Sequence, residues 1–269
     1  MLSQPSRLLA YLVAILYAIL GAALFFFPEG MAPVFAWKVT GFMTMTIGGW
    51  CLGNAWLAFI AARRWEWRLV HPALIYLWSF GILETLVVIL FRSKLQLTHP
   101  IAWIYLLTLA VNILAAILGV VDWLRLRPAN PESERMTGFM RFLAIGFVVF
   151  VGFLGLYGLS AKIGDPGTNG EIFPEVMSLF TLRSFGAFYL SLTIGMIPLL
   201  FEKSRAPFIN YAFAAFGLIA IITIAAFAYL RLFNFNEHPF GLTYFTAYIV
   251  AGLFSIYLFW KYGTGFTKA

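Results

Sequence analysis

The chain has 269 residues, of which 62% are hydrophobic, 19% are aromatic and only 11% are charged. An ordinary soluble domain carries roughly 25% charged residues, so this composition excludes a water-soluble fold and indicates an integral membrane protein. No stretch between the apolar runs is long enough for a soluble catalytic domain. Any activity therefore has to lie in or against the membrane.

Eight apolar runs follow one another along the chain. Each is long enough to form a helix that crosses a bilayer, which needs about 20 residues. The runs are continuous rather than alternating, which favours helices over strands. The first run has the basic start of a signal peptide, but it lacks a cleavage site of small residues, so we expect it to stay as a helix. The sequence predicts an all-α polytopic fold with helices at about residues 8–27, 40–62, 69–91, 101–123, 139–161, 177–200, 208–230 and 240–262.

The Lys and Arg residues are distributed unevenly between the two sides of the predicted membrane. Twelve lie on the side of the two termini, five lie on the other side, and Arg183 falls inside a span. Because positively charged loops stay in the cytoplasm, we predict a bacterial-type inner membrane protein with both termini cytoplasmic. The net charge of +7 then reflects topology and attraction to anionic lipid, and we expect no nucleic-acid partner.

Two short motifs occur twice and indicate an internal duplication. Phe27-Pro28-Glu29 returns as Phe173-Pro174-Glu175, and His99-Pro100 returns as His238-Pro239. When Gly48 is aligned with Gly186, the distance to the second motif is 52 residues in one half and 53 in the other. Since each half holds an even number of spans, the copies should share one orientation.

The duplication predicts two parallel four-helix repeats. We place the first at residues 1–127, a cytoplasmic linker at 128–138 and the second repeat at 139–269. Each repeat resembles the small four-helix membrane domains of the DoxX-like class and related uncharacterised bacterial families, whose second helix carries a Thr-x-x-Arg-x-x-Gly pattern. Leu182-Arg183-Ser184-Phe185-Gly186 is closest to that pattern, whereas Met45 stands at the place of Arg183 in the first half. The resemblance implies this architecture and a redox helper as one function.

Small residues four apart favour close helix packing in both halves. Gly49 and Gly53 form such a pair on the second predicted helix, and Ala187 and Ser191 occupy the matching positions of the sixth. Such small-xxx-small faces let backbones approach each other. We interpret them as contacts within the chain rather than as an oligomer interface, because eight helices offer many neighbours.

Ionisable residues inside a span are costly, so each one is a candidate for a structural or functional role. Glu84 and Arg183 lie at similar depths in the third and sixth predicted helices, and they could form a buried ion pair between the halves. The alternatives are a neutral Glu84 with an Arg183 that reaches the surface, or a proton or anion site. Asn54 and Asn112 lie nearer the middle of their spans, where they could bridge helices or line a polar cavity.

Metal and redox chemistry have few candidate residues. The three histidines never form an HxxxH pattern, and Cys51 is the single cysteine, so we predict no metal site and no redox cysteine pair. We find no catalytic motif and predict no catalytic residue or tightly bound cofactor. Bound lipids are expected, and a pigment or quinone remains an alternative because the chain is rich in aromatic residues.

Three functions remain open on these grounds. The first is a non-catalytic accessory or scaffold subunit that packs against other membrane protein subunits in a larger complex. The second is a transporter or carrier of a small molecule or lipid, with its site between the two repeats and a cavity that reaches Asn54, Asn112 and Glu84. The third is a quinone- or thiol-linked redox helper of the DoxX-like kind.

Overall fold

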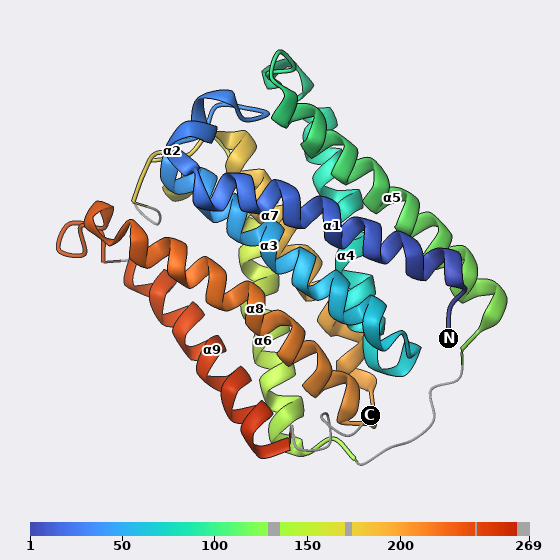
Figure 1. Cartoon of the computed structure of the whole chain (residues 1–269). Coiled ribbons are helices and arrows are strands. Elements are labelled where there is room, and N and C mark those ends of the chain that lie inside the picture. Colours follow the sequence, from blue (N-terminus) through green and yellow to red (C-terminus); the bar gives the residue numbers. More distant parts are fainter. Residues whose placement is uncertain (129–134, 170–173, 240, 263–269) are drawn as a thin grey trace.

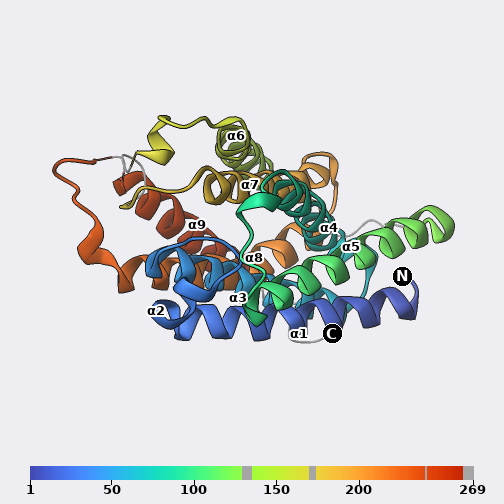
Figure 2. The same ribbon diagram turned by 90° about the horizontal axis from the view of Figure 1, so that it is seen from above.

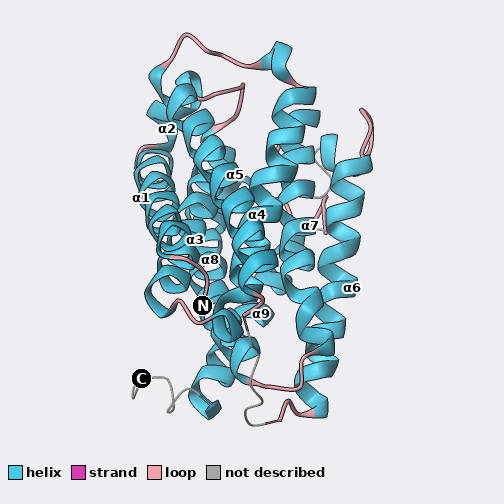
Figure 3. Cartoon of the chain, turned by 90° about the vertical axis from the view of Figure 1, so that its right-hand side faces the viewer, coloured by secondary structure: helices cyan, strands magenta, loops and turns pink. Residues whose placement is uncertain are grey.

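The computed structural model describes residues 1–128, 135–169, 174–239 and 241–262, and within these the fold is entirely helical (Figures 1 and 3). Eight helices are long and apolar enough to cross a membrane, which confirms the predicted fold class. A four-residue helix α2 (Pro28–Met31) follows the first of them. The eight are α1 (Gln4–Phe26), α3 (Gly41–Arg64), α4 (Trp67–Leu90), α5 (Pro100–Leu126), α6 (Gly138–Ser160), α7 (Leu179–Phe201), α8 (Ala206–Ala228) and α9 (Gly241–Tyr262).

Short polar residues define where several helices begin. The hydroxyls of Ser3, Thr40, Thr137 and Ser178 each accept a hydrogen bond from a backbone N–H in the first turn of α1, α3, α6 and α7. Such caps satisfy donors that a helix start leaves unpaired. The cap at Ser3 explains why α1 begins four residues earlier than its apolar run predicts.

The helices pack in a pattern that repeats between the two halves. α1 packs along α3, and α6 packs along α7 in the same way. The halves meet through α3 against α8 and through α7 against α4, so that α1 and α6 lie on opposite sides of the bundle (Figure 2). Trp50 of α3 and its counterpart Phe188 of α7 stack face to face with ring centroids 4.6 Å apart. Equivalent residues that touch each other indicate a local two-fold relation between the halves.

Glycines allow the closest backbone contacts, and these contacts are also duplicated. A Cβ on Gly48 would lie 2.5 Å from the backbone nitrogen of Phe25, and one on Gly186 would lie 2.4 Å from that of Leu159. Likewise, Gly21 and Gly155 lie against the backbones of Leu52 and Leu190. Since α1 and α3 could not approach this closely with larger residues, the glycines set the helix spacing.

The predicted small-residue pairs lie inside the protein. Gly53 packs against Leu218 of α8, and Gly49 lies against Ile222 of the same helix, so this pair contributes to the interface between the halves. Ala187 and Ser191 are fully buried, and the Ser191 hydroxyl donates to the Ala187 carbonyl oxygen. The predicted linker at 128–138 lies partly outside the described residues, and the domain boundaries stay a prediction.

Candidate functional site

Glu84 connects the two halves through hydrogen bonds. Its Oε1 accepts from the Tyr105 hydroxyl at 2.6 Å and from the Ser184 hydroxyl at 2.8 Å. Tyr105 belongs to α5, but Ser184 belongs to α7 of the second half. The Glu84 side chain is buried, and its Oε2 has no hydrogen-bond partner. The carboxyl group thus serves as an acceptor shared between three helices.

The hypothesised ion pair between Glu84 and Arg183 is not formed. Arg183 donates to the carbonyl oxygen of Ala161 at 3.4 Å, and its guanidinium lies 5.5 Å from the ring centroid of Phe91. Neighbouring helix residues point about 100° apart, so Ser184 faces Glu84 while Arg183 turns toward the end of α6. An ion pair does join Arg68 to the nearby Glu66, at 3.2 Å, far from Glu84 in the sequence.

Asn54 and Asn112 form helix-bridging hydrogen bonds. The Tyr76 hydroxyl of α4 donates to Oδ1 of Asn54. Nδ2 of Asn112 donates to the Tyr17 hydroxyl of α1 at 3.0 Å and to the Leu77 carbonyl oxygen at 3.1 Å. Both asparagines are fully buried, and neither lines the cavities described below. These amides tie α1, α3, α4 and α5 into one packed core.

The two Phe-Pro-Glu motifs supply reciprocal contacts between the halves at the end of the bundle away from the termini. The Tyr229 hydroxyl donates to Glu29 at 2.6 Å, and the Thr40 hydroxyl donates to Glu175. Partial burial, and to a lesser degree the Glu29 carboxylate, raise the pKa of Glu175 above its ordinary value. Phe173 of the second motif lies outside the described residues.

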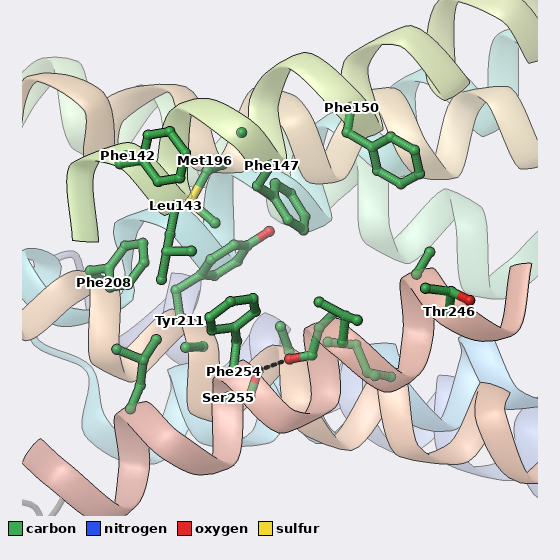
Figure 4. Close-up of a pocket in the computed structure, with 18 of the residues that line it drawn as sticks. Phe142, Leu143, Phe147, Phe150, Met196, Phe208, Tyr211, Thr246, Phe254 and Ser255 are labelled. Carbon is green, nitrogen blue, oxygen red and sulfur yellow. Dashed lines mark hydrogen bonds between the residues drawn. The ribbon is translucent and has the colours of Figure 1, made fainter. Parts of the chain in front are cut away.

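A groove opens between α6 and α9 of the second half (Figure 4). Its cavity holds about 580 Å³, and a smaller cavity of about 170 Å³ shares lining residues with it and extends toward α7. We call the two together the α6–α9 groove. Side chains from four helices line the larger cavity: Phe142, Leu143, Gly146, Phe147, Phe150, Met196, Phe208, Tyr211, Ala212, Ala215, Ile219, Leu242, Thr243, Thr246, Ala247, Val250, Ala251, Phe254, Ser255 and Leu258.

The α6–α9 groove exists because a contact of the first half has no counterpart in the second. In the first half α1 packs against α5, and Tyr17 and Asn112 join the two helices. The duplicated glycine contacts align Tyr17 with Val151, and the His-Pro register aligns Asn112 with Ala251. Two small apolar residues therefore replace a large hydrogen-bonded pair, and both line the groove. As a result, α6 and α9 barely touch along their length.

The lining of the groove is mostly apolar, and its hydroxyl groups belong to Tyr211, Thr243, Thr246 and Ser255 in the larger cavity and to Tyr189, Thr243, Tyr244 and Tyr248 in the smaller one. The Ser255 hydroxyl donates to the Ala251 carbonyl oxygen at 2.9 Å (Figure 4), and the Tyr211 hydroxyl donates to the Leu192 carbonyl oxygen at 3.4 Å. These two hydroxyls are therefore bonded to the chain's own backbone. Within the described residues, no three His, Cys, Asp or Glu side chains are grouped to hold a metal ion.

Reasoning from the sequence missed the groove because it searched for polar side chains. The available signal lay in small residues on the last helix, where Ala247 and Ala251 are four apart, together with Gly146 on α6. A Cβ on Gly146 would meet no atom within 4 Å, which shows that the position faces open space.

In comparisons with known proteins, no family model, curated protein or solved structure matches the chain. The DoxX-like resemblance stays a prediction.

Proposed function

We propose that the protein binds the apolar chain of a single-chain lipid in the α6–α9 groove, as a lipid carrier or lipid-dependent membrane component. The observation that carries the proposal is the groove itself, which is lined mostly by apolar side chains within the membrane-spanning helices. This develops the carrier hypothesis but moves its site. The interface between the halves is tightly packed, whereas the groove lies within the second half.

The size of the groove favours a chain over a protein helix. Small-molecule sites hold about 300–1,000 Å³, and the 580 Å³ of the larger cavity lies within that range. A transmembrane helix about 10 Å wide and 30 Å long would fill about 2,400 Å³. The cavity could therefore not enclose a whole helix of a partner.

The length of the groove favours one long chain over the paired chains of a phospholipid. Its lining face on α9 runs from Leu242 to Leu258, which corresponds to about 24 Å of helix. One leaflet of the hydrocarbon core is about 15 Å thick, so the groove is longer than one leaflet. A volume of 580 Å³ divided by that length gives a mean cross-section of about 24 Å². This area fits one hydrocarbon chain, because apolar atoms in contact are about 4 Å apart.

The groove is accessible from the lipid side. Phe142 is 69% exposed, and Leu242 and Val250 are 51% and 43% exposed, although all three line the cavity. A lipid chain could therefore enter sideways from the bilayer without crossing a polar barrier.

Gly146→Phe tests the proposal, because Gly146 lines the groove and a Cβ at this position would meet no atom within 4 Å, so the new ring would take up space in the groove. Val149→Phe is the matched control, since Val149 lies on the same helix, is 67% exposed and does not line the groove. Purified protein in lipid nanodiscs would be labelled with a neutral long-chain fatty alcohol that carries a diazirine. Labelled peptides would then be identified by mass spectrometry.

We expect labels on α6 and α9 in the unmodified protein, a loss of at least about fivefold in Gly146→Phe, and little change in the control. A fivefold loss corresponds to about 1 kcal/mol of binding free energy, the amount that about one methylene group contributes on burial. Equal labelling of all three proteins would refute the proposal.

An accessory subunit is the second candidate. This function is supported by the wide surface that α6 and α9 present to lipid. In the most apolar 18-residue segment of each of these helices, only 28% is buried inside the protein. Mild detergent extraction followed by native mass measurement separates the two functions. A stable complex with other chains would support the accessory subunit, and a free protein that retains a lipid would support the carrier.

A further inference from the structure

Basic residues lie close in the sequence to lining residues at one end of the α6–α9 groove. Arg141 lies beside the lining residue Phe142 in the first turn of α6, and Arg205 directly precedes α8. Lys261 lies in the last turn of α9, three residues after the lining residue Leu258. Each of the three helices that form most of the groove thus contributes one cation at the same end.

Contacts between these elements hold the cations near one another. Arg141 donates to the carbonyl oxygen of Glu202 at 3.4 Å, in the short connection that leads to Arg205. The Arg205 guanidinium lies 5.0 Å from the ring centroid of Tyr262, and Nζ of Lys261 lies 5.4 Å from the same centroid. The last turn of α9 and the first turn of α6 lie at the same end of the bundle (Figures 1 and 3). We call Arg141, Arg205 and Lys261 the basic rim.

The two ends of the groove differ in charge. Near the basic rim, Lys203 adds a further positive charge and Glu202 contributes the single carboxylate of the connection between α7 and α8. At the other end, the connections that flank the groove carry two basic residues, Lys162 and Arg231, and more acidic ones, which include Asp165, Glu175 and Glu237. The excess positive charge therefore occurs where the groove meets the basic rim.

We propose that the occupant of the groove is a single-chain lipid with a phosphate headgroup, such as a polyprenyl phosphate. The chain lies along α9, and the phosphate binds among the cations of the basic rim. This inference rests on the proposed function and adds the headgroup to it. Guanidinium and ammonium groups donate charge-assisted hydrogen bonds to phosphate oxygens, whereas a neutral alcohol or quinone headgroup offers them no charge.

The expected preference follows from the charge. Each Lys or Arg near an anionic headgroup contributes about a fivefold gain in affinity at moderate ionic strength. We therefore expect the phosphate form of a lipid to bind at least about fivefold more tightly than the alcohol with the same chain. High salt should reduce this preference, because exposed charges are screened within about 10 Å at 0.1 M.

Two probes isolate the headgroup: geranylgeranyl phosphate and geranylgeraniol share one chain and differ by the phosphate. Each would compete with the diazirine fatty alcohol for labelling of the full-length protein in nanodiscs of neutral lipid. The test variant is Arg141→Gln with Lys261→Gln, both of which are exposed. The control is Arg63→Gln with Arg125→Gln, which removes the same charge from exposed residues of the first half. Lys261→Gln alone replaces the test variant if the double change prevents recovery.

We expect geranylgeranyl phosphate to compete at least about fivefold better than geranylgeraniol, with this advantage largely lost in the test variant and kept in the control. Equal competition by both probes, with labelling still blocked by Gly146→Phe, would refute the phosphate headgroup and leave the proposed function intact. Equal loss of the advantage in the control would also refute the basic rim as the site. If neither probe competes and Gly146→Phe changes nothing, the proposed function itself fails.

Discussion

Alanine at Gly53 tests the packing that joins the two halves. A Cβ at this position would lie 2.6 Å from Cα and Cβ of Leu218 on α8, closer than real Cβ contacts. At Gly49, one turn earlier on the same helix, the nearest atom would be Cγ1 of Ile222 at 3.4 Å, which is an ordinary contact. Glycine to alanine therefore creates a steric conflict at Gly53 and none at Gly49.

The comparison isolates the steric effect. Inserting a methyl group into a well-packed interior costs about 1–3 kcal/mol. Replacing a helical glycine by alanine also gains about 0.5–1 kcal/mol of backbone conformational free energy, and both variants receive this gain. We therefore expect Gly53→Ala to be less stable than Gly49→Ala by about 1–3 kcal/mol.

Unfolding of both variants in mixed detergent micelles, followed by tryptophan fluorescence or circular dichroism, would measure this difference. Equal stability would mean that α3 and α8 separate at little cost, and the reasoning about the interface would be wrong.

Three further predictions concern Glu84, Glu175 and the two positions that leave the groove open. Glu84→Leu leaves the Tyr105 and Ser184 hydroxyls without their acceptor, and it should lower the free energy of unfolding by about 1–3 kcal/mol for each of them. Glu84→Gln keeps an acceptor oxygen and should lower the free energy of unfolding by less. Chemical unfolding of both variants would measure the difference. Because the pKa of Glu175 is raised in the folded protein, the folded state keeps a proton that the unfolded chain has already released, so stability should fall as the pH rises above about 4, the ordinary pKa of glutamate. Glu175→Gln should flatten that fall in a melting-temperature series, and an unchanged slope would contradict the assignment. Val151→Tyr with Ala251→Asn should form between α6 and α9 a hydrogen bond equivalent to the one that joins α1 and α5. We expect this double variant to have a higher melting temperature and to lose labelling of the groove. A gain in labelling would show that the aligned positions do not meet.

Much of the fold follows from the sequence, because the bilayer imposes its thickness on every span and leaves continuous apolar runs as the signal. The alignment of Gly48 with Gly186 also identifies residues that make equivalent backbone contacts. The short helix α2 was missed because its four residues carry no periodic pattern.

The candidate site could not be predicted in the same way. Glu84 was identified correctly as a buried group, but its partner depends on the rotation of α7, which turns Ser184 rather than Arg183 toward it. The groove exists because α6 and α9 lack large side chains at the positions that Tyr17 and Asn112 fill in the first half. The sequence reveals this difference only when the two halves are aligned.

The two-fold pairing of α3 with α8 and of α7 with α4 has an evolutionary consequence. One four-helix unit could once have closed on an identical copy through a self-complementary surface, as symmetric dimers do. Gene fusion would have freed the two copies from sharing every mutation. One copy could then keep the hydrogen-bonded core built on Tyr17 and Asn112, while the other has Val151 and Ala251 at the aligned positions and the α6–α9 groove in its place.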